Sequence, residues 1–277
     1  MGNRMEDDEH LLAIDDAGWA IEGLDLPMET VFRPVWDAQA QEIVAYMVVA
    51  RGETPSGAKS YGYSALGQHR TLERIARLDI AMLRHAVQAA EYEIPGERPT
   101  YVMSPVYVRS MRFDNIQVLY HDVFRTIGRA AKARIILQLI VDDPLFRISD
   151  VRWDTSKLSN YCDFVALHLG AGVNDMQILE RVPVGAVGCT AYDFLPAAPA
   201  LDAHQRFVVR YAATHRLSPF ATGVRDIESA LMLGGLGMRW LAGPFLGIDR
   251  TDPGPRRRLT GEDLVRAERE GRAPTAR

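Results

Sequence analysis

Two neighbouring carboxylates and one histidine are the side chains that could do acid–base chemistry. Asp142-Asp143 directly follows a predicted buried strand, and His168 lies near the end of the apolar run at residues 163–169. A carboxylate pair can hold a divalent cation or exchange a proton, and histidine titrates near neutral pH. One hypothesis is therefore a hydrolytic site at Asp142, Asp143 and His168. The simpler interpretation is that the two aspartates cap a loop and that His168 is a satisfied core or rim histidine.

Other nucleophiles give weaker patterns. Ser104 can be drawn into a triad with His168 and Asp142, but the spacing does not support it and no nucleophile elbow is present. Cys162 and Cys189 lack the spacing of metal ligands. Two lone cysteines fit a reducing cytoplasm, where they act as small core residues. We therefore expect a cytoplasmic protein without a cofactor.

Composition narrows the classes of partner. The chain has 277 residues, a net charge of −4 and 47% hydrophobic residues, which suits one large globular domain with tails. It contains no apolar run of membrane-spanning length and no secretory signal. The mild acidic balance argues against a general nucleic-acid binder. We expect neither a membrane nor a nucleic acid as partner.

Short apolar runs alternate with helical patterns along most of the chain. The predicted strands are 31–36, 43–50, 100–106, 134–141, 163–169, 184–189, 217–222 and 238–242, and the predicted helices are 71–91, 114–131, 174–182, 200–216 and 226–236. Such alternation favours a parallel sheet, and at this length a closed (β/α)8 barrel. An open doubly wound sheet is the alternative, disfavoured because no glycine-rich phosphate fingerprint follows any strand.

The remaining segments are predicted from their composition. Pro34 lacks a donor, so the first strand should be short or lie at an edge. Residues 52–68 are rich in Gly, Ser and Pro and are predicted to form a long loop.

Both ends of the chain are predicted to be tails around a barrel at residues 29–250. Residues 1–28 form an acidic arm, and residues 251–277 form a C-terminal tail. Thr260 and Asp263 resemble a capping box, so a short helix is expected to about residue 270. The arginine triplet at 256–258 is interpreted as solvated.

Residues 31–51 also carry a family resemblance. Residues 32–37 read FRPVWD and residues 43–51 read IVAYMVVAR, which resembles the opening Y-Q-P-I-V-D…G-x-I-V-G-x-E-A-L-L-R of EAL-domain cyclic di-GMP phosphodiesterases. Residues 134–139 and 219–246 continue the resemblance, with Gly223, Gly237 and Gly243 in register. It covers about residues 31–248. It implies a TIM-like (β/α)8 barrel of EAL type whose first strand is antiparallel to the others.

The resemblance also implies a metal site that this chain has lost. The family cleaves a phosphodiester with two hard cations, which prefer carboxylate ligands at the C-terminal ends of barrel strands. Met47 replaces the name-giving glutamate, and a thioether is a poor ligand for such ions. The degenerate metal-site positions are Met47, Met103, Gln138, His168, Thr190 and Thr222. We therefore predict no phosphodiesterase activity and no bound metal.

The leading hypothesis is a catalytically inactive EAL-like domain that serves as a regulatory protein-interaction module in bacterial signalling. One alternative is a metal-independent sensor of cyclic di-GMP or another nucleotide, bound by a cationic patch of Arg33, Arg51 and Arg225. The other is the hydrolase with a relocated site described above. A protein partner is favoured over cyclic di-GMP, and homodimerisation is left open.

Overall fold

The structure is a computed structural model. It describes residues 28–53, 57–91, 98–112, 114–142, 158, 160–170, 173, 184–191, 198–247, 249–271 and 274. Residues 1–27 of the predicted N-terminal arm (1–28), the predicted helix at 174–182 and Asp143 lie outside these residues, whereas Met28 belongs to the first strand.

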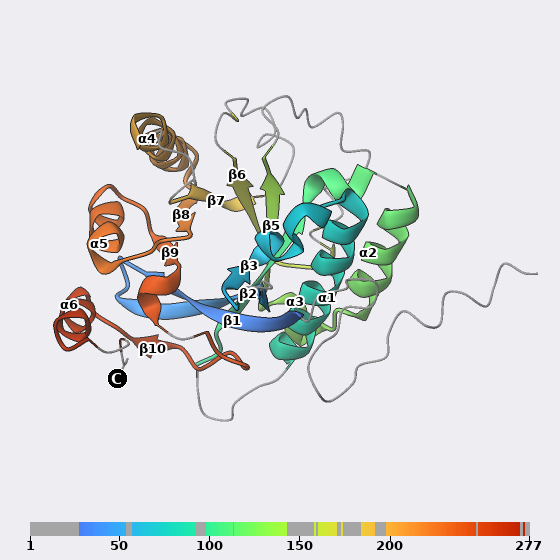
Figure 1. Ribbon diagram of the computed structural model, residues 1–277, viewed down its shortest axis with the longest axis horizontal. Helices are drawn as coiled ribbons and strands as arrows, with labels where there is room; N and C mark the ends of the chain where they lie inside the picture. The colour runs from blue at the N-terminus through green and yellow to red at the C-terminus, as the bar shows by residue number, and fades with distance from the viewer. Residues whose placement is uncertain are drawn as a thin grey trace, which may run out of the picture.

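Within the described residues, eight strands close into a ring (Figure 1). They are β1 (Met28–Asp37), β2 (Glu42–Glu53), β4 (Tyr101–Tyr107), β5 (Ile135–Val141), β6 (Phe164–Leu169), β7 (Val184–Thr190), β8 (Ser218–Thr222) and β9 (Trp240–Ala242). The order is β1-β9-β8-β7-β6-β5-β4-β2, and β1 pairs again with β2. Because β1 is antiparallel to both neighbours while the other pairs are parallel, the predicted barrel with an antiparallel first strand is confirmed.

Helices cover the outside of this ring. They are α1 (Leu72–Glu91), α2 (Asp114–Thr126), α3 (Arg129–Lys132), α4 (Ala198–His215), α5 (Ile227–Gly235) and α6 (Gly261–Arg269), with short 3-10 segments η2 (Gly62–His69), η3 (Val108–Arg112) and η7 (Pro244–Leu246). Figure 1 shows α1, α2 and α3 on one side of the barrel and α4, α5 and α6 on the other. In the described part of the chain, every helix is too short or too polar to cross a membrane.

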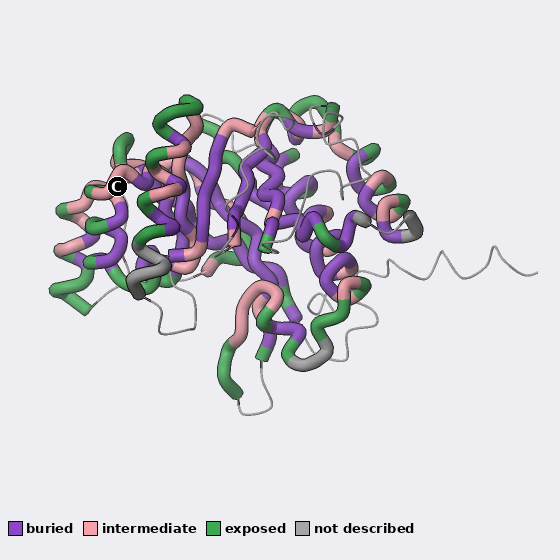
Figure 2. Tube along the Cα trace, turned by 90° about the horizontal axis from the view of Figure 1, so that it is seen from above, coloured by how far each residue is buried: buried purple, intermediate pink, exposed green. Residues whose placement is uncertain are grey.

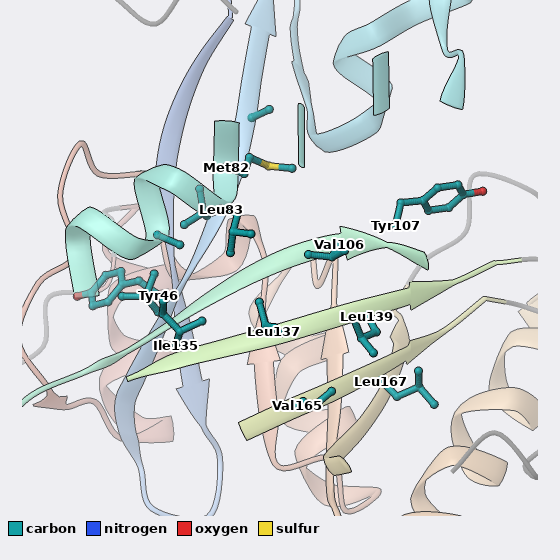
Figure 3. Packing of buried hydrophobic residues seen from close by; sticks show 14 of the residues in the cluster. Tyr46, Met82, Leu83, Val106, Tyr107, Ile135, Leu137, Leu139, Val165 and Leu167 are labelled. Atoms are coloured by element: carbon teal, nitrogen blue, oxygen red, sulfur yellow. The ribbon is translucent and has the colours of Figure 1, made fainter. Parts of the chain in front are cut away.

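The core has two layers because successive strand residues face opposite sides. Side chains such as Val102, Leu137 and Val165 point outward and pack under the helices. Figure 3 shows Leu83 of α1 above this layer, and Figure 2 shows the strands buried along their length. The alternate residues, including Ile136 and Phe220, fill the barrel interior. Cys162 and Cys189 are buried, as expected for core residues.

The prediction for the first strand was wrong. β1 is 10 residues long and has partners on both sides. The amide of Phe32 donates to the carbonyl of Arg250, and the β9 ladder begins only at Val35. Pro34 lies between these two pairings, so its missing N–H removes no ladder bond.

The prediction of a loop over residues 52–68 was also wrong. β2 continues to Glu53, and the short strand β3 (Lys59–Tyr61) pairs with it before η2 begins. The glycine and serine content of this segment favours a loop, but pairing with β2 makes part of it a strand. The end of β2 has backbone N–H and C=O groups that need hydrogen-bond partners, and β3 supplies them.

Two further segments differ from prediction. The helix at 114–131 is broken into α2 and α3, since Gly128 is extended at the N-cap of α3.

The capping box of Thr260 and Asp263 forms and starts α6, as predicted. The arginine triplet is not simply solvated, because Arg256 Nε lies 2.6 Å from Glu42 and the next two arginines form β10 (Arg257–Arg258) against β2.

Candidate functional site

The C-terminal ends of the parallel strands bring polar side chains to one mouth of the barrel. Ile136, Ala166 and Phe220 belong to the inner cluster. Because the period of a strand is two, Gln138, His168 and Thr222 face inward one step nearer the mouth on β5, β6 and β8.

Gln138 and His168 form a hydrogen-bonded chain with Thr190 at the end of β7. Gln138 Nε2 lies 3.0 Å from His168 Nδ1, and His168 Nε2 lies 3.1 Å from Thr190 Oγ1. With the amide donating, Nδ1 accepts and the imidazole proton lies on Nε2, which donates to Thr190. This geometry agrees with the simpler interpretation of His168, in which both ring nitrogens have hydrogen-bond partners.

Burial keeps this chain uncharged. Gln138 and His168 are 2% and 7% exposed. Desolvation, with a smaller contribution from the nearby His204, lowers the pKa of His168 to about 4. The imidazole is therefore neutral at physiological pH. Where the family resemblance calls for carboxylates, the mouth presents an amide, an imidazole and a hydroxyl.

The six degenerate positions do not fit a pair of hard cations. Met47 and Met103 are adjacent in the β2–β4 register and belong to the apolar inner cluster. Thr222 is paired with Thr190 across β7 and β8. None of the six is a carboxylate, and the described residues include no group of three or more His, Cys, Asp or Glu that could hold a metal ion. Two dications there would repel each other without anionic ligands between them.

Arg33 and Arg51 of the predicted cationic patch are each paired with a carboxylate. Arg33 donates to both carboxylate oxygens of Asp249, at 2.8 and 3.0 Å, and its guanidinium lies 4.6 Å from the centre of the Tyr61 ring. Arg51 Nε donates to Glu29 at 2.6 Å. Arg225 is exposed on the loop after β8. Arg33 and Arg51 thus lie in the same β1–β2 pair, each neutralised by a carboxylate.

The residues of the acid–base hypothesis have other partners. Asp142 accepts from Tyr107 Oη at 2.6 Å and lies 3.8 Å from Arg70. Burial, then the bond to Asp142, raises the pKa of Tyr107 to about 12. Ser104 is buried, and its hydroxyl has no hydrogen-bond partner among the described residues. No hydrogen bond between described residues joins Asp142 to His168, so the structure does not assemble the drawn triad.

Solved structures of the same architecture exist, whereas no family model and no curated protein matches the chain. One is the PaMucR phosphodiesterase in complex with c-di-GMP, with a TM-score of 0.64 and 15% identity over 80% of this chain and 92% of that one. Another is the EAL domain of Mycobacterium smegmatis DcpA, with a TM-score of 0.57 and 16% identity over 89% and 100%. The barrel has the fold of an EAL domain. The FimX EAL domain from Pseudomonas aeruginosa bound to c-di-GMP is also similar, with a TM-score of 0.57 and 13% identity over 81% and 91%.

One buried ionisable residue of this EAL-like barrel was not among the predicted site residues. Asp79 lies on α1 and is 0% exposed, although its neighbours on the same helical face are Ile75 and Leu83. Its carboxyl oxygens lie within hydrogen-bond distance of the hydroxyls of Tyr63 and Tyr120, at 2.6 and 2.7 Å. The sequence contains a signal for the burial of Asp79. It lies four residues from Ile75 and four from Leu83, so it falls on the apolar stripe of the predicted helix.

Proposed function

We propose that this EAL-like barrel is catalytically inactive and acts by binding, as a regulatory protein-interaction module in bacterial cyclic di-GMP signalling. The observation that carries the proposal is the neutral Gln138–His168–Thr190 chain at the strand ends. Metal-assisted cleavage of a phosphodiester needs anionic oxygen ligands that hold and space the cations. An uncharged chain that is already hydrogen-bonded internally offers none.

The arginine pairs favour a protein partner over a nucleotide. A phosphate that bound Arg33 would have to displace Asp249, and both side chains of that pair are almost fully buried. Removing one partner of a buried ion pair leaves an uncompensated charge. Tyr61 also packs on Arg33 and on the inner cluster, so it covers the guanidinium on another side.

One observation favours a metal-independent nucleotide sensor as the second candidate. Gln138 Oε1 is buried and has no hydrogen-bond partner among the described residues. A buried acceptor without a donor is costly, and a ligand with an N–H or O–H group would satisfy it. A nucleobase is one ligand with such donors.

Isothermal titration of cyclic di-GMP, in Mg²⁺ and then in EDTA, tests the two candidates, together with a turnover assay in Mn²⁺. The leading proposal expects neither heat nor turnover. Binding that survives EDTA would replace it with the sensor. In that case Arg51→Glu should weaken binding at least tenfold, whereas Arg77→Glu, a charge reversal on the exposed face of α1, should not. Steady turnover would overturn both candidates.

The protein-binding part needs its own measurement. A partner recovered by pull-down should bind the purified chain saturably in EDTA, in a titration without nucleotide. If no protein binds saturably while the chain is folded, the interaction module is contradicted even when the barrel is inactive.

A further inference from the structure

The carboxyl of Asp79 sits where three segments meet α1. Tyr63 of η2 donates to Oδ1 at 2.6 Å. At Oδ2, the backbone N–H of Tyr107 donates at 2.7 Å and Tyr120 Oη of α2 lies 2.7 Å away. Two more contacts continue from there, because Ser110 Oγ lies 2.8 Å from Tyr120 Oη and 2.7 Å from the carbonyl oxygen of Tyr107.

The hydrogen-bonded path from Asp79 to the carbonyl of Tyr107 lacks one proton when Asp79 is ionised. The path Asp79 Oδ2–Tyr120 Oη–Ser110 Oγ–Tyr107 O contains three oxygen–oxygen contacts. Each contact needs one proton, and a carbonyl brings none. The two hydroxyls supply only two. If Asp79 is ionised, one contact has no proton and two lone pairs face each other.

A proton on Asp79 Oδ2 completes the path. Oδ2–H then donates to Tyr120, Tyr120 donates to Ser110, and Ser110 donates to the carbonyl of Tyr107. Tyr63 still donates to Oδ1, so no polar group of the cluster is left without a partner.

We propose that Asp79 is a neutral carboxylic acid in the closed barrel, and that the segment formed by β3 and η2 (residues 59–69) is a proton-linked cover of the barrel mouth. This segment, the mouth cover, pairs with the C-terminal end of β2 through β3 and is tied to α1 by Tyr63. Tyr61 of the mouth cover packs on Arg33 and on the inner cluster. The inference goes beyond the proposed function and holds whatever the barrel binds.

The surroundings of Asp79 support a neutral acid. Burial raises the pKa of Asp79 from 3.8 to about 7, against the bonds from Tyr63, Tyr107 and Tyr120, which lower it. Among the described residues, no cation contacts the carboxyl. The titratable and charged groups around the cluster are Tyr63 and Arg70 from the mouth cover and its end, Tyr107 and Arg109 from β4 and η3, Tyr120 from α2, and Asp142 after β5.

Loss of the proton favours opening of the mouth cover. An ionised Asp79 is an uncompensated buried charge, so states that let water reach it gain in population. Among the residues whose burial the structure describes, α2 buries Ile116, Val123 and Phe124, whereas η2 buries Ala65 and Leu66. The segment with fewer buried apolar contacts opens first. Opening should therefore increase as the pH rises from about 4 towards 7, and then level off.

The direct test is an NMR titration of the Asp79 side-chain carboxyl carbon, combined with hydrogen-exchange protection factors for residues 59–69 from pH 5 to 8. We expect the carboxyl to titrate near pH 7. Protection of the mouth cover should fall about tenfold from pH 5.5 to 6.5 and level off above 7. A carboxylate that is ionised throughout this range overturns the neutral acid, and protection that does not follow the titration overturns the proton-linked cover.

Variants separate the parts of the cluster. Ser110→Ala removes the acceptor of the Tyr120 hydroxyl, which is then free to donate to Asp79. Such a bond stabilises the carboxylate, so the acid dissociation constant of Asp79 should rise about tenfold. Tyr63→Phe should lower protection of the mouth cover at every pH without ionising Asp79. Tyr61→Phe is the matched control in the same segment, since its hydroxyl is not bonded to Asp79, and it should leave the pH profile unchanged.

Discussion

A single imidazole is the ionisable group of the hydrogen-bonded chain at the strand ends. His168 receives a hydrogen bond from Gln138 and gives one to Thr190, so both ring nitrogens are used without a net charge. Phe220 packs beside the ring at 5.9 Å. A second proton would place a cation between the amide of Gln138, which donates a hydrogen bond, and the apolar ring of Phe220. The charged form is therefore disfavoured, and the pKa of His168 is lowered.

His168 should make stability depend on pH in a defined window. Its pKa is lowered from 6.5 to about 4 on folding, so its contribution is fully present above pH 6.5 and is lost as the pH falls towards 4. The loss is about 3 kcal/mol, from roughly 1.4 kcal/mol per pKa unit. The free energy of unfolding in urea should therefore differ between wild type and His168→Gln by an amount that changes across this window, because the opposite contribution of Asp79 is common to both proteins. His215→Gln, at an exposed histidine of α4, should keep the wild-type pH dependence, and an equal slope in both variants would contradict the assignment.

The hydrogen-bonded chain could not have been predicted from the sequence alone. Gln138 and His168 are 30 residues apart, and His168 and Thr190 are 22 apart. The pattern showed only that each position lacked a carboxylate. Which nitrogen meets which oxygen depends on strand register, and parallel registers are set by packing around the whole ring. The pairing of Arg33 with Asp249, 216 residues apart, could not be predicted for the same reason, since it too depends on strand register.

At the level of elements, apolar periodicity predicted most strands and helices because each has one buried side. α1 and β5 were predicted to within one or two residues at each end. Two of the failures, β3 and β10, are segments whose structure depends on a distant partner. β3 and β10 exist because β2 pairs with them, and their own residues are polar.

Gly243 should be the least tolerant glycine in the β8–β9 region. A Cβ on Gly243 would clash with the backbone oxygen of Val224, which cannot move aside as a side chain can. Gly243→Ala should lower the free energy of unfolding by about 3 kcal/mol or more. A Cβ on Gly235 of α5 meets nothing within 4 Å, so Gly235→Ala is the matched control and should be neutral or stabilising by up to about 1 kcal/mol. Equal thermal shifts in the two variants would contradict this account.

For the whole molecule, the ion pair between Arg33 and Asp249 joins the first strand to the segment after the last strand of the ring. Both side chains are almost fully buried, at 10% and 6% exposure. The backbone reinforces this junction, since Phe32 and Arg250 exchange two hydrogen bonds. The pair therefore closes the barrel and at the same time keeps a guanidinium at the mouth neutralised.

Asp249→Asn should destabilise the barrel by about 3–5 kcal/mol, because it leaves the guanidinium of Arg33 buried and unpaired. The control is Glu29→Gln at the more exposed Arg51 pair, which should cost under about 1 kcal/mol. Chemical denaturation of both variants measures the difference. Similar small effects would show that Arg33 reaches water and is accessible to an anion.

The closure of the ring also means that the first strands wait for their last partners during synthesis. β1 and β2 leave the ribosome first, yet Trp36 of β1 donates its indole N–H to the carbonyl of Leu259, 223 residues later. At roughly 5–20 residues per second, about 10–45 s pass before that partner emerges. During this interval the apolar β1–β2 hairpin has an unpaired edge, which is a template for association with other chains. The nascent hairpin is thus the segment on which a chaperone bound during translation would have the greatest effect.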